Sequence, residues 1–207
     1  LRNASVSVLS TYFEEKPKAI EIENIINKID KSNTESLLSI LTLLGNIWHK
    51  NEEKVLQILL EFIKYDNIEV KEKISKIIVD KSSMEADLIL NELIKIPDIS
   101  KFVSKGIISR TIIKIAQKIP EKIIPKLIKF SQSENIDIKL NALSAIEGIL
   151  DDYSNKIDIR EIFSILQTTR NKEVKKEISK ILKKLAQKDP ESIEPIINEL
   201  IEIFGEQ

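Results

Sequence analysis

The residues that could carry out chemistry are few, and His49 is the only histidine among the 207 residues. A zinc site needs several cysteine or histidine ligands, and the sequence contains no cysteine. No nucleophile elbow or other local pattern supports a Ser-His-Asp arrangement that would use His49 as its base. We therefore interpret His49 as an exposed surface residue, and we predict no catalytic residue, no metal site and no cofactor.

Paired carboxylates stand at Glu52-Glu53 and at Asp151-Asp152. Both pairs lie at the ends of expected helices, and an acid close to a helix start is stabilised by the helix dipole. No segment has the residue spacing of an EF-hand calcium loop or of a Walker phosphate loop. A structural role explains these pairs, and the sequence predicts a protein that is not an enzyme.

Trp48 is the only tryptophan, and a lone tryptophan in a helical repeat can mark a site where a peptide or a base stacks. The repeat described below places it in one column with Phe13, Ala116, Leu150 and Ala186. Because every member of this column is apolar, we interpret Trp48 as a packing residue rather than a stacking site.

The distribution of charge is more informative than any single residue. The chain has 32 basic and 33 acidic residues, so no overall field attracts nucleic acid or an anionic membrane. Locally, however, segments 70–82, 101–118 and 174–188 together hold 15 Lys and Arg against 3 Asp and Glu. Segment 189–204 holds five acids and no base. The sequence thus predicts a locally basic surface on a nearly neutral protein.

A helical repeat of 34 to 36 residues positions these side chains. In residues 174–188 the apolar side chains recur at i, i+4, i+7, i+8 and i+11, which is one face of an α-helix. Each unit has two helices. The first helices are expected to start near residues 17, 52, 86, 120, 155 and 190, and the second helices near 1, 36, 70, 104, 138 and 174. A prolyl residue is tolerated in the first turn of a helix, which fits Pro17, Pro120 and Pro190.

The repeat predicts an all-α solenoid of about 12 antiparallel helices, in which stacked units build one continuous core. We expect a single domain over 1–207: a leading second helix at 1–15, repeats at about 17–50, 51–82, 84–118, 120–152 and 156–188, and a final first helix at 189–204. Because this register begins and ends within a unit, we expect a segment of a longer solenoid or missing terminal residues.

Residues 53–78, 121–150 and 159–186 carry the clearest version of the unit. Residues 121–150 read EKIIPKLIKFSQSENIDIKLNALSAIEGIL: a first helix near Pro, a turn with Asn and Asp, then an apolar residue and Lys at the next start. This pattern resembles the HEAT-repeat, armadillo-like family over essentially the whole chain, although the period is short and Ile largely replaces Ala in the second helix. The signature patterns of ankyrin and tetratricopeptide repeats are absent. The resemblance implies a right-handed α–α superhelix whose second helices line the concave surface.

Two rows of cations cross the expected second helices. The first row is Arg2, Lys71, Lys105, Lys139 and Lys175, where the family carries a base that pairs with acids of the turn, so we discount it as a binding surface. The second row, with its neighbours, is the candidate partner-binding face: Lys76, Arg110, Lys114, Lys180, Lys183 and Lys184. The alternative is a solvated surface on which these lysines pair with nearby acids.

The fold and the charges together favour a non-enzymatic scaffold for protein–protein interaction, with a protein partner that carries an acidic segment. The alternative is a nucleic-acid-binding HEAT-like protein, including a HEAT-like DNA glycosylase, although the neutral charge and 5 % aromatic content argue against the glycosylase. No apolar run is long enough to span a membrane. The lack of cysteine favours a reducing, cytoplasmic setting. End-to-end self-association, or continuation into further repeats, is also expected.

Overall fold

The structure is a computed structural model of the chain, and it describes residues 2–15, 22–28, 30–96 and 106–205. Within these residues it contains helices and no strand. The α-helices are α1 (Arg2–Glu15), α2 (Ile22–Lys28), α3 (Thr34–Asn46), α4 (Glu52–Phe62), α5 (Ile68–Leu93), α6 (Ile107–Lys118), α7 (Pro120–Ser131), α8 (Ile136–Tyr153), α9 (Ile159–Thr168), α10 (Lys172–Lys188) and α11 (Ile197–Gly205). Short 3₁₀ helices are η2 (Trp48–Lys50), η4 (Ser154–Lys156) and η5 (Pro190–Ile196). The predicted all-α solenoid is confirmed.

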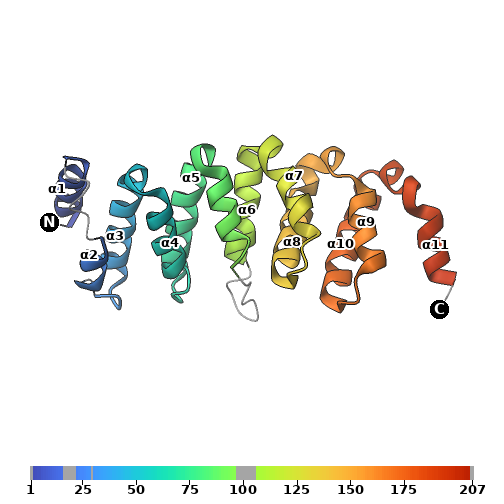
Figure 1. Cartoon of the computed structure of the whole chain (residues 1–207), viewed down its shortest axis with the longest axis horizontal. Helices are drawn as coiled ribbons and strands as arrows, with labels where there is room; N and C mark the ends of the chain where they lie inside the picture. The colour runs from blue at the N-terminus through green and yellow to red at the C-terminus, as the bar shows by residue number, and fades with distance from the viewer. Residues whose placement is uncertain (1, 16–21, 29, 97–105, 206–207) are drawn as a thin grey trace. The chain divides into compact units, whose positions relative to one another are not determined.

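The chain forms two compact units, Leu1–Ile89 and Leu90–Gln207, and α5 runs from the first into the second. Within each unit successive helices fold back on one another as antiparallel hairpins (Figure 1). The single domain over 1–207 and the right-handed superhelix stay predictions.

Asparagine starts most of the second helices. The side chains of Asn33, Asn67, Asn135 and Asn171 each accept a hydrogen bond from a backbone N–H of the first turn of α3, α5, α8 or α10, at 2.9 to 3.2 Å. Such a cap satisfies an N–H that the helix itself leaves without a partner. The repeated turn residues therefore set the phase of the second helices.

The first helices begin by two different devices. The side chains of Asn51 and Asp158 accept from backbone N–H groups of α4 and α9. Pro120 and Pro190 instead occupy the first position of α7 and η5, where the missing N–H has no helical partner to lose.

Two boundaries differ from the expected ones. No turn separates the helices expected on either side of residue 84, and α5 continues through it with a single non-helical residue, Glu85 (φ −119°, ψ 38°). The sequence there, KSSMEADL, offers no Gly or Pro to end a helix. The helix expected at 189–204 is divided into η5 and α11, with Pro195 just before the division; Pro125, at the same place of the repeat, lies inside the continuous α7.

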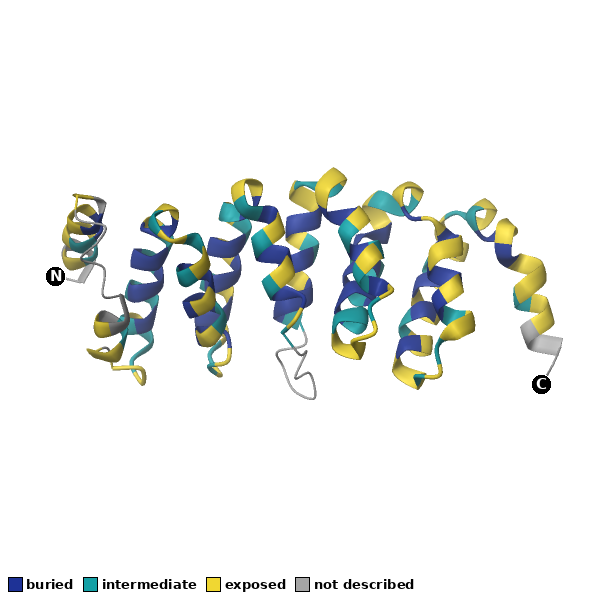
Figure 2. Ribbon diagram, viewed as in Figure 1, coloured by how far each residue is buried: buried dark blue, intermediate teal, exposed yellow. Residues whose placement is uncertain are grey.

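The core runs along the facing sides of the helices (Figure 2). Isoleucines at the same place in four second helices, Ile40, Ile74, Ile108 and Ile178, are all buried. In the second unit α8 packs against α6, α7 and α10. Gly148 allows the close approach of α6, because a Cβ at this position would lie 2.2 Å from Cδ1 of Ile113.

Polar side chains join successive repeats within each unit. These hydrogen bonds connect residues 29 to 36 positions apart: Asn46 to Ser10, Asn67 to Thr34, Gln117 to Asp152, Gln132 to Glu161, and Gln167 to Glu199. Two of the separations, 36 for Asn46 to Ser10 and 35 for Gln117 to Asp152, equal the period read from the sequence, and the other three are shorter.

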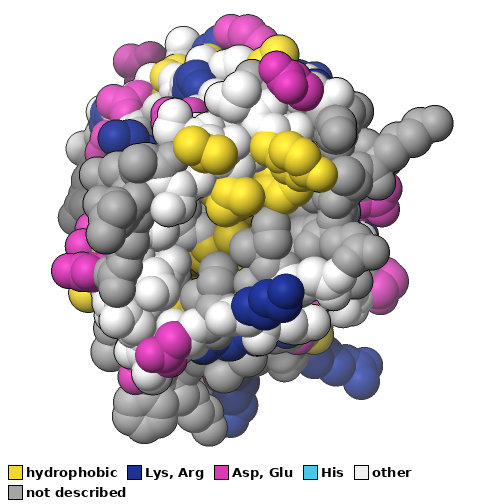
Figure 3. All heavy atoms as spheres, turned by 90° about the vertical axis from the view of Figure 1, so that its left-hand side faces the viewer, with side chains coloured by type: hydrophobic (Ala, Val, Ile, Leu, Met, Phe, Trp, Pro, Cys, Tyr) yellow, Lys and Arg dark blue, Asp and Glu magenta, His cyan; other side chains and the backbone are white. Residues whose placement is uncertain are grey.

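Exposed apolar side chains occur in pairs on α1 and α11, besides Ile68, Met84 and Ile136 on α5 and α8. Val8 and Tyr12 of α1 are 68 % and 44 % exposed, and apolar side chains gather on the face that α1 presents (Figure 3). Ile197 and Ile201 of α11 are 46 % and 63 % exposed. The place of Val8 in its helix is that of Leu43 in α3, which is buried. Self-association or continuation into further repeats through these faces stays a prediction.

Candidate functional site

The six cations of the candidate partner-binding face lie on three helices. Lys76 is on α5 in the first unit, Arg110 and Lys114 are on α6, and Lys180, Lys183 and Lys184 are on α10 in the second unit. All are exposed except Lys184, which is half-buried.

Two of these cations are held by their own helices. The Nε of Arg110 donates to the carbonyl oxygen of Gly106 at 2.7 Å. The Nζ of Lys180 lies 2.6 Å from Oε1 of Glu177, three residues earlier on α10. Surface ion pairs of this kind contribute little to stability, about 0.2–1 kcal/mol. They nevertheless reduce the positive charge that the surface offers to a partner.

Lys184 connects α10 to α8. Its Nζ lies 2.9 Å from Oδ2 of Asp151 and 3.4 Å from Oε1 of Glu147, and it donates to the carbonyl oxygen of Glu147 at 3.1 Å. Lys188, one turn later, donates to the carbonyl oxygen of Leu150 at 3.3 Å. Both lysines therefore serve carbonyl groups near the C-terminal end of α8, where a cation is favoured by the helix dipole.

The pKa values reflect this cluster. The hydrogen bond from Lys184, with the charges of Lys184 and Lys188, holds the pKa of Asp151 below its ordinary value, although burial acts in the opposite direction. Partial burial would lower the pKa of Lys184, but its hydrogen bonds and the charges of Asp151 and Glu147 outweigh this effect and raise the pKa. Lys184 is thus engaged within the protein.

Helix α8 interrupts the row of cations in the second unit. Ser144 occupies the place that Arg110 has on α6 and Lys180 has on α10. One turn further, Glu147 and Asp151 add negative charge beside α10. In the described part of the chain, Lys76, Lys114 and Lys183 form no ion pair. The structure therefore leaves a weaker and less continuous basic surface than the sequence suggests.

In the first row of cations, Lys71 has the structural role that the sequence predicts for the row. This side chain is buried, and its Nζ lies 3.7 Å from Oδ1 of Asp66 in the preceding turn. Lys139 is half-buried and Lys175 is exposed. Lys105 and the side chain of Arg2 lie outside what the structure describes.

The other residues singled out for chemistry lie where a structural role requires. His49 is exposed as predicted, and Trp48 is buried with 2 % of its surface accessible, which confirms the packing interpretation. In the same column, Ala186 departs from the pattern because it is exposed. Over residues 2–15, 22–28, 30–96 and 106–205, no group of three or more His, Asp or Glu side chains could hold a metal ion. No helix in those ranges has the length and apolar character needed to cross a membrane.

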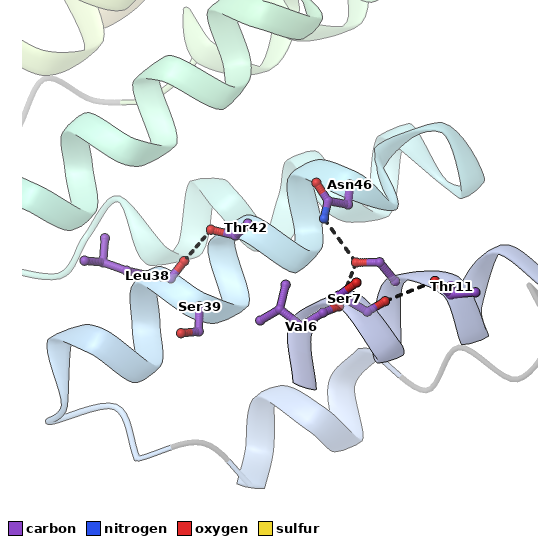
Figure 4. A pocket seen from close by; sticks show the side chains of 8 residues that line it. Val6, Ser7, Thr11, Leu38, Ser39, Thr42 and Asn46 are labelled. Carbon is purple, nitrogen blue, oxygen red and sulfur yellow. Dashed lines mark hydrogen bonds between the residues drawn. The ribbon is translucent and has the colours of Figure 1, made fainter. Parts of the chain in front are cut away.

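A pocket of about 440 Å³ lies between two second helices of the first unit, α1 and α3 (Figure 4). Six of its lining residues carry a hydroxyl or amide group, and two are aliphatic: Ser7, Ser10, Thr11, Ser39, Thr42 and Asn46, with Val6 and Leu38. All eight belong to α1 or α3. We call this site the α1–α3 pocket.

The α1–α3 pocket occupies the same places in the repeat as the predicted cations. Ser7 and Thr42 stand where Lys76 and Arg110 stand in later repeats, six residues after the expected start of the second helix. The sequence interpretation missed the pocket because it followed charge, and hydroxyl residues give no such contrast. The available signal was the change at one repeat position from Ser or Thr to Lys or Arg.

The hydroxyl groups of the pocket are oriented by the helices that carry them. Ser10 donates to the carbonyl oxygen of Val6 and Thr42 to that of Leu38, both at 2.9 Å (Figure 4). The amide of Asn46 crosses from α3 to α1 and donates to Oγ of Ser10 at 3.1 Å. The two walls of the pocket are therefore tied together, and Ser10 is almost fully buried.

Comparison with solved structures finds a designed armadillo repeat protein that is 18 % identical to this chain. The match covers 88 % of this chain and 92 % of the designed protein, with a TM-score of 0.36. No protein-family model matches the sequence, and the comparison with curated proteins finds no match.

Proposed function

We propose that the chain is a non-enzymatic scaffold that binds a segment of another protein, and that the α1–α3 pocket is part of the binding surface. The observation that supports this proposal most is the pocket itself, an open depression of about 440 Å³ between two second helices. Its size falls in the range of about 300–1,000 Å³ that is usual for ligand sites.

The chemistry of the pocket favours binding over catalysis. Among the described residues that line it there is no His, Asp, Glu, Lys or Arg. A serine or threonine hydroxyl is a weak nucleophile unless a base lies within hydrogen-bond reach. The lining side chains can supply hydrogen bonds and, through Val6 and Leu38, apolar contact. These are the contacts by which helical repeats hold an extended segment.

A selection of random linear peptides displayed on phage, using the whole 207-residue chain as bait, tests the proposal. The variant Ser39→Arg places a long side chain at the pocket, and Ser179→Arg on α10 is its matched control. The two serines are equivalent locally, since each hydroxyl donates to the carbonyl oxygen four residues earlier at 2.8 Å.

We expect selected peptides to bind the wild type and Ser179→Arg equally and Ser39→Arg at least about tenfold more weakly, the loss of one or two hydrogen bonds or contacts. No enrichment of peptides, or equal binding to both variants, would contradict the proposal. Far-UV circular dichroism of both variants checks that they fold.

The basic face remains a second candidate contact, for an acidic segment of the same partner. Lys76, Lys114 and Lys183 are the members that are exposed and form no ion pair within the described part of the chain. Nucleic-acid binding is the alternative that these cations raise. Labelled duplex and single-stranded DNA, titrated at two salt concentrations, decide it: micromolar binding with a steep dependence on salt would overturn the protein-scaffold proposal.

The HEAT or armadillo-like family assignment and the cytoplasmic location remain part of the same proposal. They rest on the repeat pattern and on the absence of cysteine from the sequence.

A further inference from the structure

We infer that the α1–α3 pocket selects a peptide segment that presents hydrogen-bond donors, through side-chain amide or ammonium groups, and rejects acidic or phosphorylated segments. This inference rests on the proposed function and specifies the chemistry of the partner.

The hydroxyl hydrogens of the pocket are almost all used within the protein. Ser10, Thr11, Ser39 and Thr42 each donate to the carbonyl oxygen four residues earlier in their own helix, at 2.8 to 3.2 Å. A hydroxyl group has one hydrogen to donate and two lone pairs that accept. What these residues offer to a ligand is therefore acceptor oxygen, directed away from the backbone to which the hydrogen is committed.

The remaining polar atoms, on Asn46 and Ser7, add few hydrogen-bond donors to these acceptors. One amide hydrogen of Asn46 is donated to Ser10, which leaves its second amide hydrogen and its acceptor oxygen Oδ1. The hydroxyl of Ser7 makes no hydrogen bond with the described residues. Two donor hydrogens are thus left in the pocket, against acceptor oxygens on five of its polar side chains, since the oxygen of the nearly buried Ser10 already accepts from Asn46.

An anion would bind poorly at such a site. A carboxylate or phosphate oxygen would lose water and face mainly other oxygen lone pairs, and no cation lines the described walls to compensate. An amide or ammonium group instead loses water from its N–H groups on binding and finds acceptor oxygens of the pocket in its place. The cations at the same repeat positions of α5, α6 and α10 suit the opposite partner chemistry, so preference should change along the chain.

Three acetylated, amidated octapeptides in which alanine alternates with glutamine, lysine or glutamate provide matched probes. Binding of each to the whole chain is measured by methyl-detected NMR titration, with the variants Thr42→Val and Ser7→Ala. Thr42→Val keeps the shape of the side chain and removes its acceptor oxygen. Circular dichroism and the urea midpoint of each variant show whether it is folded.

We expect the glutamine and lysine peptides to bind, and the glutamate peptide to bind at least about tenfold more weakly. Thr42→Val should weaken the glutamine peptide about three- to tenfold, as expected for one neutral hydrogen bond. Binding of the lysine peptide alone, with loss at high salt, would mean that charge is recognised and would overturn the donor rule. Equal binding of the glutamate peptide would do the same.

The phage selection separates this inference from the proposed function. If the selected peptides bind Ser39→Arg as well as wild type, the pocket is not the binding site and the proposed function fails. If they lose binding to Ser39→Arg but are enriched in Asp and Glu, only the present inference fails. If all three octapeptides bind too weakly to measure, the composition of the peptides selected on phage tests the donor preference instead. An excess of Asn, Gln, Lys and Arg over Asp and Glu supports the preference, and the opposite ratio contradicts it.

Discussion

The substitution Lys184→Met tests whether Lys184 stabilises the packing of α10 on α8. Methionine keeps the apolar stem and removes the ammonium group, which lies 2.9 Å from Oδ2 of Asp151 and 3.1 Å from the carbonyl oxygen of Glu147. The Lys184 side chain is only 26 % exposed. The ammonium group contributes a surface-type ion pair of about 0.2–1 kcal/mol and a hydrogen bond to a backbone carbonyl of α8 of about 0.5–1.5 kcal/mol. The free energy of unfolding should fall by about 1–2 kcal/mol.

Urea unfolding followed by circular dichroism measures this change, and Lys183→Met is the matched control. Lys183 is the preceding residue on α10, it is exposed, and it has no ion pair in the described ranges. The control should change the free energy of unfolding by less than about 0.5 kcal/mol, as substitutions at ordinary surface sites do. Equal effects of the two substitutions would refute a structural role for Lys184 and return it to the candidate partner-binding face.

The pH dependence of the same difference gives a second readout. The pKa of Asp151 is lowered on folding, so its contribution is present above its unfolded value of 3.8 and is lost as the pH falls through the lower folded value. The pKa of Lys184 is raised, so its contribution is present below its unfolded value of 10.5 and is lost as the pH rises through the higher folded value. The stability difference between wild type and Lys184→Met should therefore be constant from about pH 5 to 9 and shrink outside this window.

Two further predictions concern the packing around two glycines and the hydrogen bonds of a buried asparagine. Gly45→Ala adds a methyl group 3.5 Å from Ile77, an ordinary contact, and should raise the free energy of unfolding by about 0.5–1 kcal/mol, whereas Gly148→Ala clashes with Ile113 at 2.2 Å and should lower it by about 1–3 kcal/mol. A similar gain from both, measured by urea unfolding, would contradict the close approach of α6 and α8. Asn141 is buried and donates to two carbonyl oxygens just after α5, so Asn141→Ala should cost about 2–3 kcal/mol; an unchanged urea midpoint would show that these carbonyls find other partners.

The helix starts could be predicted because their determinants are local. Asn67 and Asn135 cap the first turns of α5 and α8, and Pro120 begins α7, so each signal lies within a few residues of the boundary that it sets. The continuity of α5 was not predicted. The sequence near residue 84 has no local signal that would end a helix, and only the non-helical Glu85 marks the place where the second of the two expected helices begins.

The candidate site could be predicted only in part, because it depends on which helices are neighbours. The pairing of Lys184 with Glu147 and Asp151 joins residues 37 and 33 positions apart. Opposite charges at adjacent places of successive repeats were visible in the sequence, and they would have indicated that Lys184 is engaged. For the α1–α3 pocket the sequence offered only the change from Ser or Thr to Lys or Arg at one repeat position, because the volume of the pocket depends on the spacing of two helices.

The repeat constrains buried and exposed positions differently. Four residues after the expected start of the second helix, the residues of α3, α5, α6, α8 and α10 are all apolar and buried, because the stacked core needs an apolar side chain there: Ile40, Ile74, Ile108, Ala142 and Ile178. Two residues further along, the side chain changes from Thr42 to Lys or Arg without affecting that core. The side chains at this position, Thr42 in α3 and Lys76, Arg110 and Lys180 in α5, α6 and α10, therefore vary without a matching change in the buried position beside them.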